Sequence, residues 1–176
     1  MIYTMSYSDS MEIDLREPGP LALGLMRIVL GFMLVWAFLD KMFGLGFPSP
    51  SSAAVINGGS PTEYYLNVLV EGPFEGIYHA LAGNAFVDFL LLAGLLAVGS
   101  AMMLGIASKL ATVGSVVMMA LMFTLVLPPS DNPLVDYHIV YILATLVIYW
   151  FGGYSHLGLE DRWKGLSLVK RYPILE

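Results

Sequence analysis

Four long apolar segments constrain what this chain can fold into more than any other feature of its sequence. Each is close to the ~20 residues that an α-helix needs to cross a hydrocarbon layer of ~30 Å. Charged residues make up only 12% of the 176 residues, whereas about 25% is usual for a soluble domain. The sequence therefore predicts a single all-α domain, an integral membrane four-helix bundle. We expect its helices at about 21–43, 85–105, 107–127 and 135–151.

Proline and glycine residues support these boundaries. Pro20 stands in the first turn of the first helix, where proline is tolerated. Pro128 and Pro129 end the third helix, and glycines at 152–153 close the fourth. Residues 1–20 are polar and acidic, with no basic region before the first apolar run. We therefore expect no cleavable signal peptide, a first apolar segment that is retained, and a tail at 153–176.

The distribution of Lys and Arg predicts the orientation. If the four helices alternate in direction, Lys41 lies on one side of the membrane and Arg27 within the first helix. By the positive-inside rule, the other side is cytoplasmic and holds both ends of the chain. The expected location is the plasma membrane, crossed several times. The cytoplasmic side carries Arg16, Lys109, Arg162, Lys164, Lys170 and Arg171.

Residues 44–83 form a long connection between the first two helices, and we call this segment the lid. Ser60 and Glu63 have the spacing of a capping box, which predicts a short helix after them. A second short amphipathic helix is expected after Gly72 and Pro73, lying on the membrane surface or across the mouth of the bundle. Its apolar face would hold Phe74, Ile77, Tyr78 and Leu81.

Ionisable residues within membrane spans are costly, so each is a candidate for function. Arg27 is predicted to bind hydroxyl groups and backbone carbonyls, either as a structural anchor or as part of a site. An outer polar layer follows from helical depth at 1.5 Å per residue. The fourth helix should turn one polar stripe towards the bundle interior, at His138, Tyr141, Thr145 and Tyr149. The outer layer contains Asp40, Lys41, Asp88, Asp136, Tyr137, His138 and Tyr141.

His138 is the strongest catalytic candidate, because an imidazole titrates near neutral pH and can transfer protons. The alternative is a buried histidine that is satisfied by Asp136, Asp88 or a tyrosine. Asp88 is the second catalytic candidate, as a proton relay or as an ion-pair partner of Lys41. We expect Lys41, His138 and Asp88 to surround one cavity under the lid. The candidates for substrate binding are Lys41, Arg27, Tyr137, Tyr141, Asp136 and Asp40.

Several functional classes are disfavoured by the composition. The chain has no cysteine, so it can form neither a disulfide nor a thiolate metal site. A net charge of -6 and the absence of a basic patch argue against a nucleic-acid partner. The methionines at 118, 119 and 122 are interpreted as packing residues rather than a copper site. We expect no metal and no haem.

Four segments of the sequence resemble the DoxX/DoxD-like membrane family: RIVLGFMLVWAFLDKMFG, INGGSPTEYYL, EGPF and NPLVDYHIVYILATLVIYWFGG. This resemblance implies a four-helix membrane protein. The best-described DoxD-type members are the large subunit of thiosulfate:quinone oxidoreductase, which works with a small DoxA-like subunit. The resemblance transfers no catalytic residues to this chain.

The leading hypothesis is a DoxD-like subunit of a membrane oxidoreductase that passes electrons from a small sulfur anion such as thiosulfate to quinone, with quinone as co-substrate. Lys41 would bind the anion, His138 and Asp88 would handle the protons, and Tyr137 or Tyr141 would flank the quinone ring. One alternative is a non-catalytic structural or assembly subunit of a larger membrane complex. Another is a transport or binding module for lipids or small molecules. The expected partners are the lipid bilayer, further membrane subunits and a second copy of the chain.

Overall fold

The computed structural model describes residues 18–68, 70–130, 132 and 134–176. Within these ranges the regular elements are all helices, which confirms the all-α prediction. The four longest helices are α1 (Pro18–Phe43), α4 (Ala85–Leu104), α5 (Ser108–Leu125) and α6 (Tyr137–Trp150). Most of the predicted N-terminal segment, including Arg16, lies outside the described residues.

Three of these helices are long and apolar enough to cross a membrane. Mean hydropathy over an 18-residue window is 2.1 for α1, 2.1 for α4 and 1.6 for α5. The apolar helix α6 has only 14 residues, which gives it a length of about 21 Å at 1.5 Å per residue. Large apolar side chains on the outer faces are exposed, such as Phe89 at 66% and Leu143 at 58%. This is the surface of a protein that contacts lipid.

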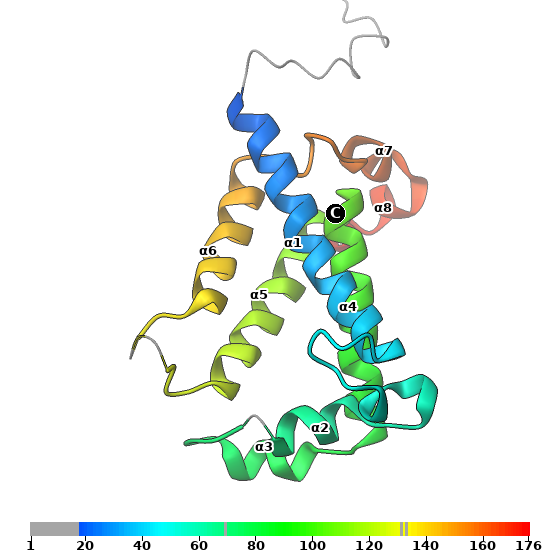
Figure 1. The fold of residues 1–176 in the computed structure, drawn as a ribbon. Coiled ribbons are helices and arrows are strands. Elements are labelled where there is room, and N and C mark those ends of the chain that lie inside the picture. Colours follow the sequence, from blue (N-terminus) through cyan, green and yellow to red (C-terminus); the bar gives the residue numbers. More distant parts are fainter. Residues whose placement is uncertain (1–17, 69, 131, 133) are drawn as a thin grey trace, which may run out of the picture.

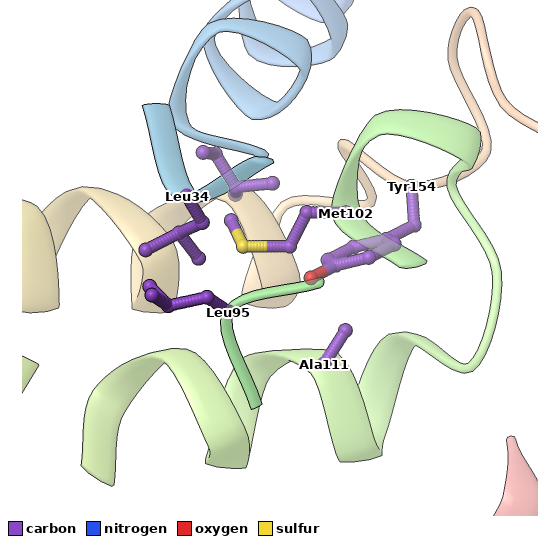
Figure 2. Close-up of a cluster of buried hydrophobic side chains, with 6 residues drawn as sticks. Leu34, Leu95, Met102, Ala111 and Tyr154 are labelled. Carbon is purple, nitrogen blue, oxygen red and sulfur yellow. The ribbon is translucent and has the colours of Figure 1, made fainter. Parts of the chain in front are cut away.

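The four long helices pack around a shared core (Figure 1). α1 packs closely along α4 and more lightly against α6, whereas α5 packs against both α4 and α6. Figure 2 shows the core cluster, in which Leu34 of α1 and Leu95 and Met102 of α4 lie near Ala111 of α5. Together with Ile148 of α6, these buried side chains link all four helices. The cluster is completed by Ile148 and Tyr154.

Two glycines allow α1 and α4 to approach each other closely. A Cβ atom added to Gly31 would lie 2.7 Å from the backbone nitrogen of Met103 and 2.8 Å from the carbonyl oxygen of Gly99. Any larger residue at Gly31 would push the two backbones apart. Gly105 then ends α4 in the left-handed conformation, with φ at 67°, and leads directly into α5.

The lid covers one end of the helices with α2 (Pro61–Val68) and α3 (Glu75–Leu81) (Figure 1). The Ser60 half of the predicted capping box is present at α2, because the backbone nitrogen of Glu63 donates to Ser60 Oγ at 3.0 Å. Tyr78 of α3 lies 2.6 Å from Thr124 Oγ1 through its hydroxyl, which ties the lid to the end of α5. The predicted apolar face of α3 is largely on the outside, with Ile77 63% exposed.

The tail, residues 153–176, is folded against the opposite end. It forms α7 (Glu160–Gly165), α8 (Ser167–Arg171) and a short 3-10 helix at Pro173–Leu175. The backbone nitrogen of Leu159 donates to the carbonyl of Leu104 at 2.9 Å, and that of Lys109 donates to the carbonyl of Glu176 at 2.9 Å. These bonds fasten the tail to the turn between α4 and α5. The short helices of the tail were not expected from the sequence.

Candidate functional site: a cavity between the four helices

A cavity of about 190 Å³ lies between α1, α4, α5 and α6, in the half of the molecule nearer the lid. Its wall is mainly apolar and contains four methionine side chains, whose unbranched thioethers adapt to irregular space. Its polar side chains come chiefly from α6. The lining includes Leu30, Met33, Lys41, Ser115, Met118, Tyr137, His138, Tyr141 and Thr145.

His138 is held in a defined orientation by Asp136. Its ring atom Nδ1 lies 2.5 Å from Asp136 Oδ2, and its side chain is nearly buried. Asp136 is also the N-cap of α6, because its Oδ1 accepts hydrogen bonds from the backbone nitrogens of His138 and Ile139. The carboxylate therefore fixes the histidine ring and begins the helix that carries it. Nε2 is the ring nitrogen left to meet a ligand.

Aromatic rings surround His138 at the wall of the cavity. The Tyr137 ring lies 4.1 Å from the His138 ring and is tilted by 32° to it. Tyr141 approaches Tyr137 edge-on, with 5.7 Å between the ring centroids. Such a group of rings suits a flat ring that stacks on one face and accepts a hydrogen bond at its edge. The predicted stripe on α6 thus lines the cavity at His138, Tyr141 and Thr145, whereas Tyr149 packs against the core.

Lys41 supplies a positive charge to the cavity. Its ammonium group lies 4.1 Å from the centre of the Tyr65 ring, a cation–π contact with the lid helix α2. Burial raises the pKa of Tyr65 above its ordinary value of 10.0, and the hydroxyl lies 2.9 Å from Ser49 Oγ. Tyr65 thus remains a neutral phenol. Within the described ranges, Lys41 forms no ion pair with a carboxylate. Sequence reasoning missed Tyr65, because pairing across the lid leaves no spacing signal.

The opposite end of the cavity is also polar. Ser115 of α5 and Thr145 of α6 face each other, with 3.3 Å between their hydroxyl oxygens. Apart from Tyr141, the wall between this pair and the group formed by Lys41 and His138 consists of Leu, Met and Ala side chains. The cavity is therefore an apolar chamber with hydrogen-bonding groups at both ends.

Asp88 does not line this cavity, which corrects its expected place beside Lys41 and His138. Its Oδ1 accepts a hydrogen bond from the backbone nitrogen of Thr62 at 2.8 Å. Thr62 is in the first turn of α2, where backbone N–H groups lack partners within the helix. A negative charge at this position also suits the positive end of the helix dipole. Asp88 therefore holds the lid to α4.

Asp40 also has a structural position. It is fully buried, and its two carboxylate oxygens accept hydrogen bonds from the backbone nitrogens of Phe47 and Ser49, both at 2.8 Å. These bonds bend the chain back where it leaves α1. Asp40 is absent from the cavity wall, and its contacts do not place it for substrate binding.

Arg27 lies outside the cavity as well, in a fully buried position at the opposite end. The guanidinium of Arg27 lies 5.7 Å from the ring centre of Tyr154. The prediction of carbonyl partners is confirmed, but those partners come from the last turn of α4 and from the turns that follow α6 rather than from polar side chains at the same depth. Arg27 fastens α1 to these ends by donating to the carbonyls of Met102, Met103, Gly153, His156 and Leu157.

No group of three or more His, Asp or Glu side chains within the described ranges is placed to hold a metal ion. The fold and site define the class: a helical membrane protein with a cavity bearing an oriented histidine, a lysine and two tyrosines. In comparisons with protein-family models, curated proteins and solved structures, the chain has no match.

Proposed function

We propose that this protein is a DoxD-like, quinone-binding subunit of a membrane oxidoreductase, and that the quinone accepts electrons from a small sulfur anion of the thiosulfate type. The observation that carries the proposal is the group of Tyr137, Tyr141 and the oriented His138 on the wall of an apolar cavity. Redox-active quinone heads are flat rings with hydrogen-bond acceptors at opposite edges. The cavity offers a stacking surface, a hydrogen-bonding imidazole and a cation within one small volume.

The size of the cavity supports a single-ring ligand. An apolar cavity of about 150 Å³ is sufficient to bind benzene in another protein. At about 190 Å³, the present cavity accommodates one six-membered ring with small substituents. Tyr137 and Tyr141 would flank the ring, and His138 Nε2 would bind one carbonyl oxygen. The Ser115–Thr145 pair provides hydroxyl groups towards the other end of the chamber.

His138 and Asp136 would manage protons during quinone reduction. Oxidation of two thiosulfate anions to one tetrathionate forms a sulfur–sulfur bond and releases two electrons. Quinone takes up these two electrons and two protons to become quinol. An imidazolium at His138 can donate a proton from Nε2, while the Asp136 carboxylate stabilises the charged ring through Nδ1. The second proton must come from solvent, directly or relayed through a neighbouring hydroxyl group that solvent reprotonates.

Lys41 would attract the sulfur anion. Its ammonium group borders the cavity and forms no ion pair with a carboxylate within the described ranges. The lid opposes capture of a dianion through its negative charges at Glu63, Glu71 and Glu75. These exposed charges are screened by salt more strongly than the half-buried lysine. Raising the ionic strength should therefore speed thiosulfate capture.

The membrane arrangement is part of this proposal. The short helix α6 would be a fourth crossing, with the bilayer thinned beside it. Both ends of the chain and the α4–α5 turn would be cytoplasmic, and the lid would be extracytoplasmic, in the plasma membrane. A small DoxA-like subunit would bind this chain and would contribute any redox group that electron transfer requires.

The test is quinone reduction by thiosulfate, measured as turnover per assembled complex. His138→Ala should lower this turnover by about 10²–10⁴-fold, as expected for loss of a general acid. Lys41→Gln should mainly raise the KM for thiosulfate, because the charge contributes to ground-state binding. The matched control is His79→Ala, because His79 lies on α3 beside Glu75 and outside the cavity.

An assembly subunit would behave differently. In that case His138→Ala would lower the yield of complex and leave its turnover unchanged. Unchanged turnover in His138→Ala would therefore remove the catalytic role of this residue.

A further inference from the structure

We infer that the cavity opens sideways into the bilayer between α1 and α6, and that its ligand is a membrane-dissolved amphiphile whose ring enters while its tail remains among the lipids. Met33 of α1 and Tyr137 of α6 border this gap, which we call the lateral opening. The identity of the ligand as a quinone rests on the proposed function. The route of access rests on how the four helices pack.

Three of the four seams between neighbouring helices are closed by direct contacts. α1 meets α4 at Gly31, where backbone atoms leave no space for a Cβ. α4 meets α5 where a Cβ on Gly114 would lie 2.6 Å from Val98 Cγ2. α5 meets α6 through the hydroxyl groups of Ser115 and Thr145. At the depth of each of these contacts, a ligand could pass only by separating the helices.

The seam between α1 and α6 is closed at one end only. A Cβ on Gly153, just after α6, would lie 3.2 Å from the Cβ of Leu23. Arg27 Nε donates to the carbonyl of Gly153 at 3.0 Å at the same end. Towards the lid the two helices diverge, as Figure 1 shows, and they have much less contact than the other neighbouring pairs. The cavity lies in this diverging half.

The exposure of the lining residues identifies where the cavity meets the outside. Met33 is 40% exposed and Tyr137 is 60% exposed, although both line the cavity. By contrast, Leu34 on the inner face of α1 is 6% exposed, and so is His138. No described residue of the lid lines the cavity, so the lid covers the helix ends without forming the cavity wall. The opening is therefore on the side of the molecule, between two apolar helices.

For a tailed quinone, as in the proposed function, the volume of the cavity leads to the same route. About 190 Å³ holds a substituted ring but not an isoprenoid chain of several units. A ring that carries such a chain can be seated only if the chain leaves through an opening. The lateral opening leads directly into hydrocarbon, where an apolar chain has no desolvation cost. The site therefore selects ligands by a ring and accepts tails of any length.

Photolabelling of the whole protein in lipid nanodiscs tests this route. The probe is a benzoquinone with an isoprenoid tail that carries a diazirine several carbons from the ring. Adducts are expected on α1 and α6 peptides that flank Met33 and Tyr137, and tail-less benzoquinone should compete them away. Met33→Trp should abolish these adducts by filling the opening. Leu90→Trp is the matched control, because Leu90 is 59% exposed on α4 and outside the cavity.

The possible outcomes of this experiment test the route of access and the identity of the ligand separately. Competable adducts on the lid or on outer faces of α4 and α5 would overturn the lateral opening but leave quinone binding intact. Loss of labelling in both Met33→Trp and Leu90→Trp would also count against the opening, because the effect would not be local. If tail-less benzoquinone neither binds nor competes, the quinone proposal fails and the inference fails with it.

Discussion

Asp136 places one carboxylate oxygen 2.5 Å from Nδ1 of His138 and the other 2.9 Å from the backbone nitrogen of the same residue. A single side chain thereby begins α6 and fixes the ring that α6 presents to the cavity. A terminal helix residue would normally be free to fray. Here two hydrogen bonds to one neighbour orient both the backbone and the ring of His138.

Replacing Asp136 separates these two roles. Asp136→Asn should keep the helix cap, since asparagine is as good an N-cap as aspartate. It should nevertheless lower quinone reduction and change its pH profile, because a neutral amide does not stabilise an imidazolium. Asp136→Ala should lose the cap as well, at a cost of about 1 kcal/mol in stability. Turnover per complex across pH, together with Tm, measures both effects. Equal activity of Asp136→Asn and the unchanged protein at every pH would show that the charge has no catalytic role.

The bond between Asp88 and Thr62 predicts that the lid can be loosened without harming the cavity. Asp88→Ala removes the acceptor of the Thr62 N–H, a hydrogen bond to a charged group worth about 1.5–3 kcal/mol. Backbone amides of α2 should then exchange hydrogen faster, while ring binding stays unchanged. Glu75→Ala is the control. Within the described ranges, the ion-pair contact of Glu75 is with His79, which lies on the same helix, α3. A loss of ring binding in Asp88→Ala alone would restore Asp88 as a site residue.

The sequence predicted the helices well because length and hydropathy decide which segments can lie in lipid. The predicted range of 85–105, for example, compares with Ala85–Leu104 in the structure. The sequence also predicted that Lys41 and His138 lie near each other. Their depths in the membrane and the face of α6 that carries His138 both follow from counting residues along the helices. Those two residues do line one cavity.

The same counting could not assign Asp88 or Arg27. Depth along a helix does not say which neighbour a side chain faces, and Asp88 turns towards the lid rather than towards Lys41. The carbonyl partners of Arg27 lie in the last turn of α4 and in the turns that follow α6, and backbone carbonyls at such places carry no side-chain signal in the sequence. The tail was missed for a related reason, because α7 and α8 have only 6 and 5 residues and depend on tertiary contacts.

The proposed orientation can be measured by labelling single cysteines in this cysteine-free chain. Ser52→Cys in the lid should react with an impermeant maleimide in intact cells, whereas Ser167→Cys in α8 should react only after permeabilisation. Both positions are exposed. Ser60 is less suitable than Ser52, because its hydroxyl caps α2. Ser10, in the predicted N-terminal segment, would be a third labelling position, but it lies outside the described residues. Reaction of Ser167→Cys in intact cells would reverse the orientation.

Glu160 fixes the tail from a nearly buried position. Its carboxylate oxygens lie 2.7 Å from Ser155 Oγ and 2.8 Å from Lys164 Nζ. Burial by itself raises the pKa of Glu160, but hydrogen bonds with Lys164, Ser155 and Ser108 outweigh it and hold the pKa below the ordinary 4.5. The hydrogen bond to Glu160 raises the pKa of Lys164 above 10.5.

The sign of the pH dependence follows from these two shifts. The contribution of Glu160 to tail stability is complete above pH 4.5 and is lost as the pH falls through the lower pKa of the folded state. The contribution of Lys164 is complete below pH 10.5 and is lost as the pH rises through its higher folded pKa. Glu160→Gln should abolish both the acid and the alkaline change in tail stability. It should also lower the stability of the tail at the pH values between them. Hydrogen exchange of α7 and α8 amides against pH measures this, with the exposed neighbour Asp161→Asn as control. If Asp161→Asn shifts the acid limb as much as Glu160→Gln does, the buried carboxylate is not the titrating group.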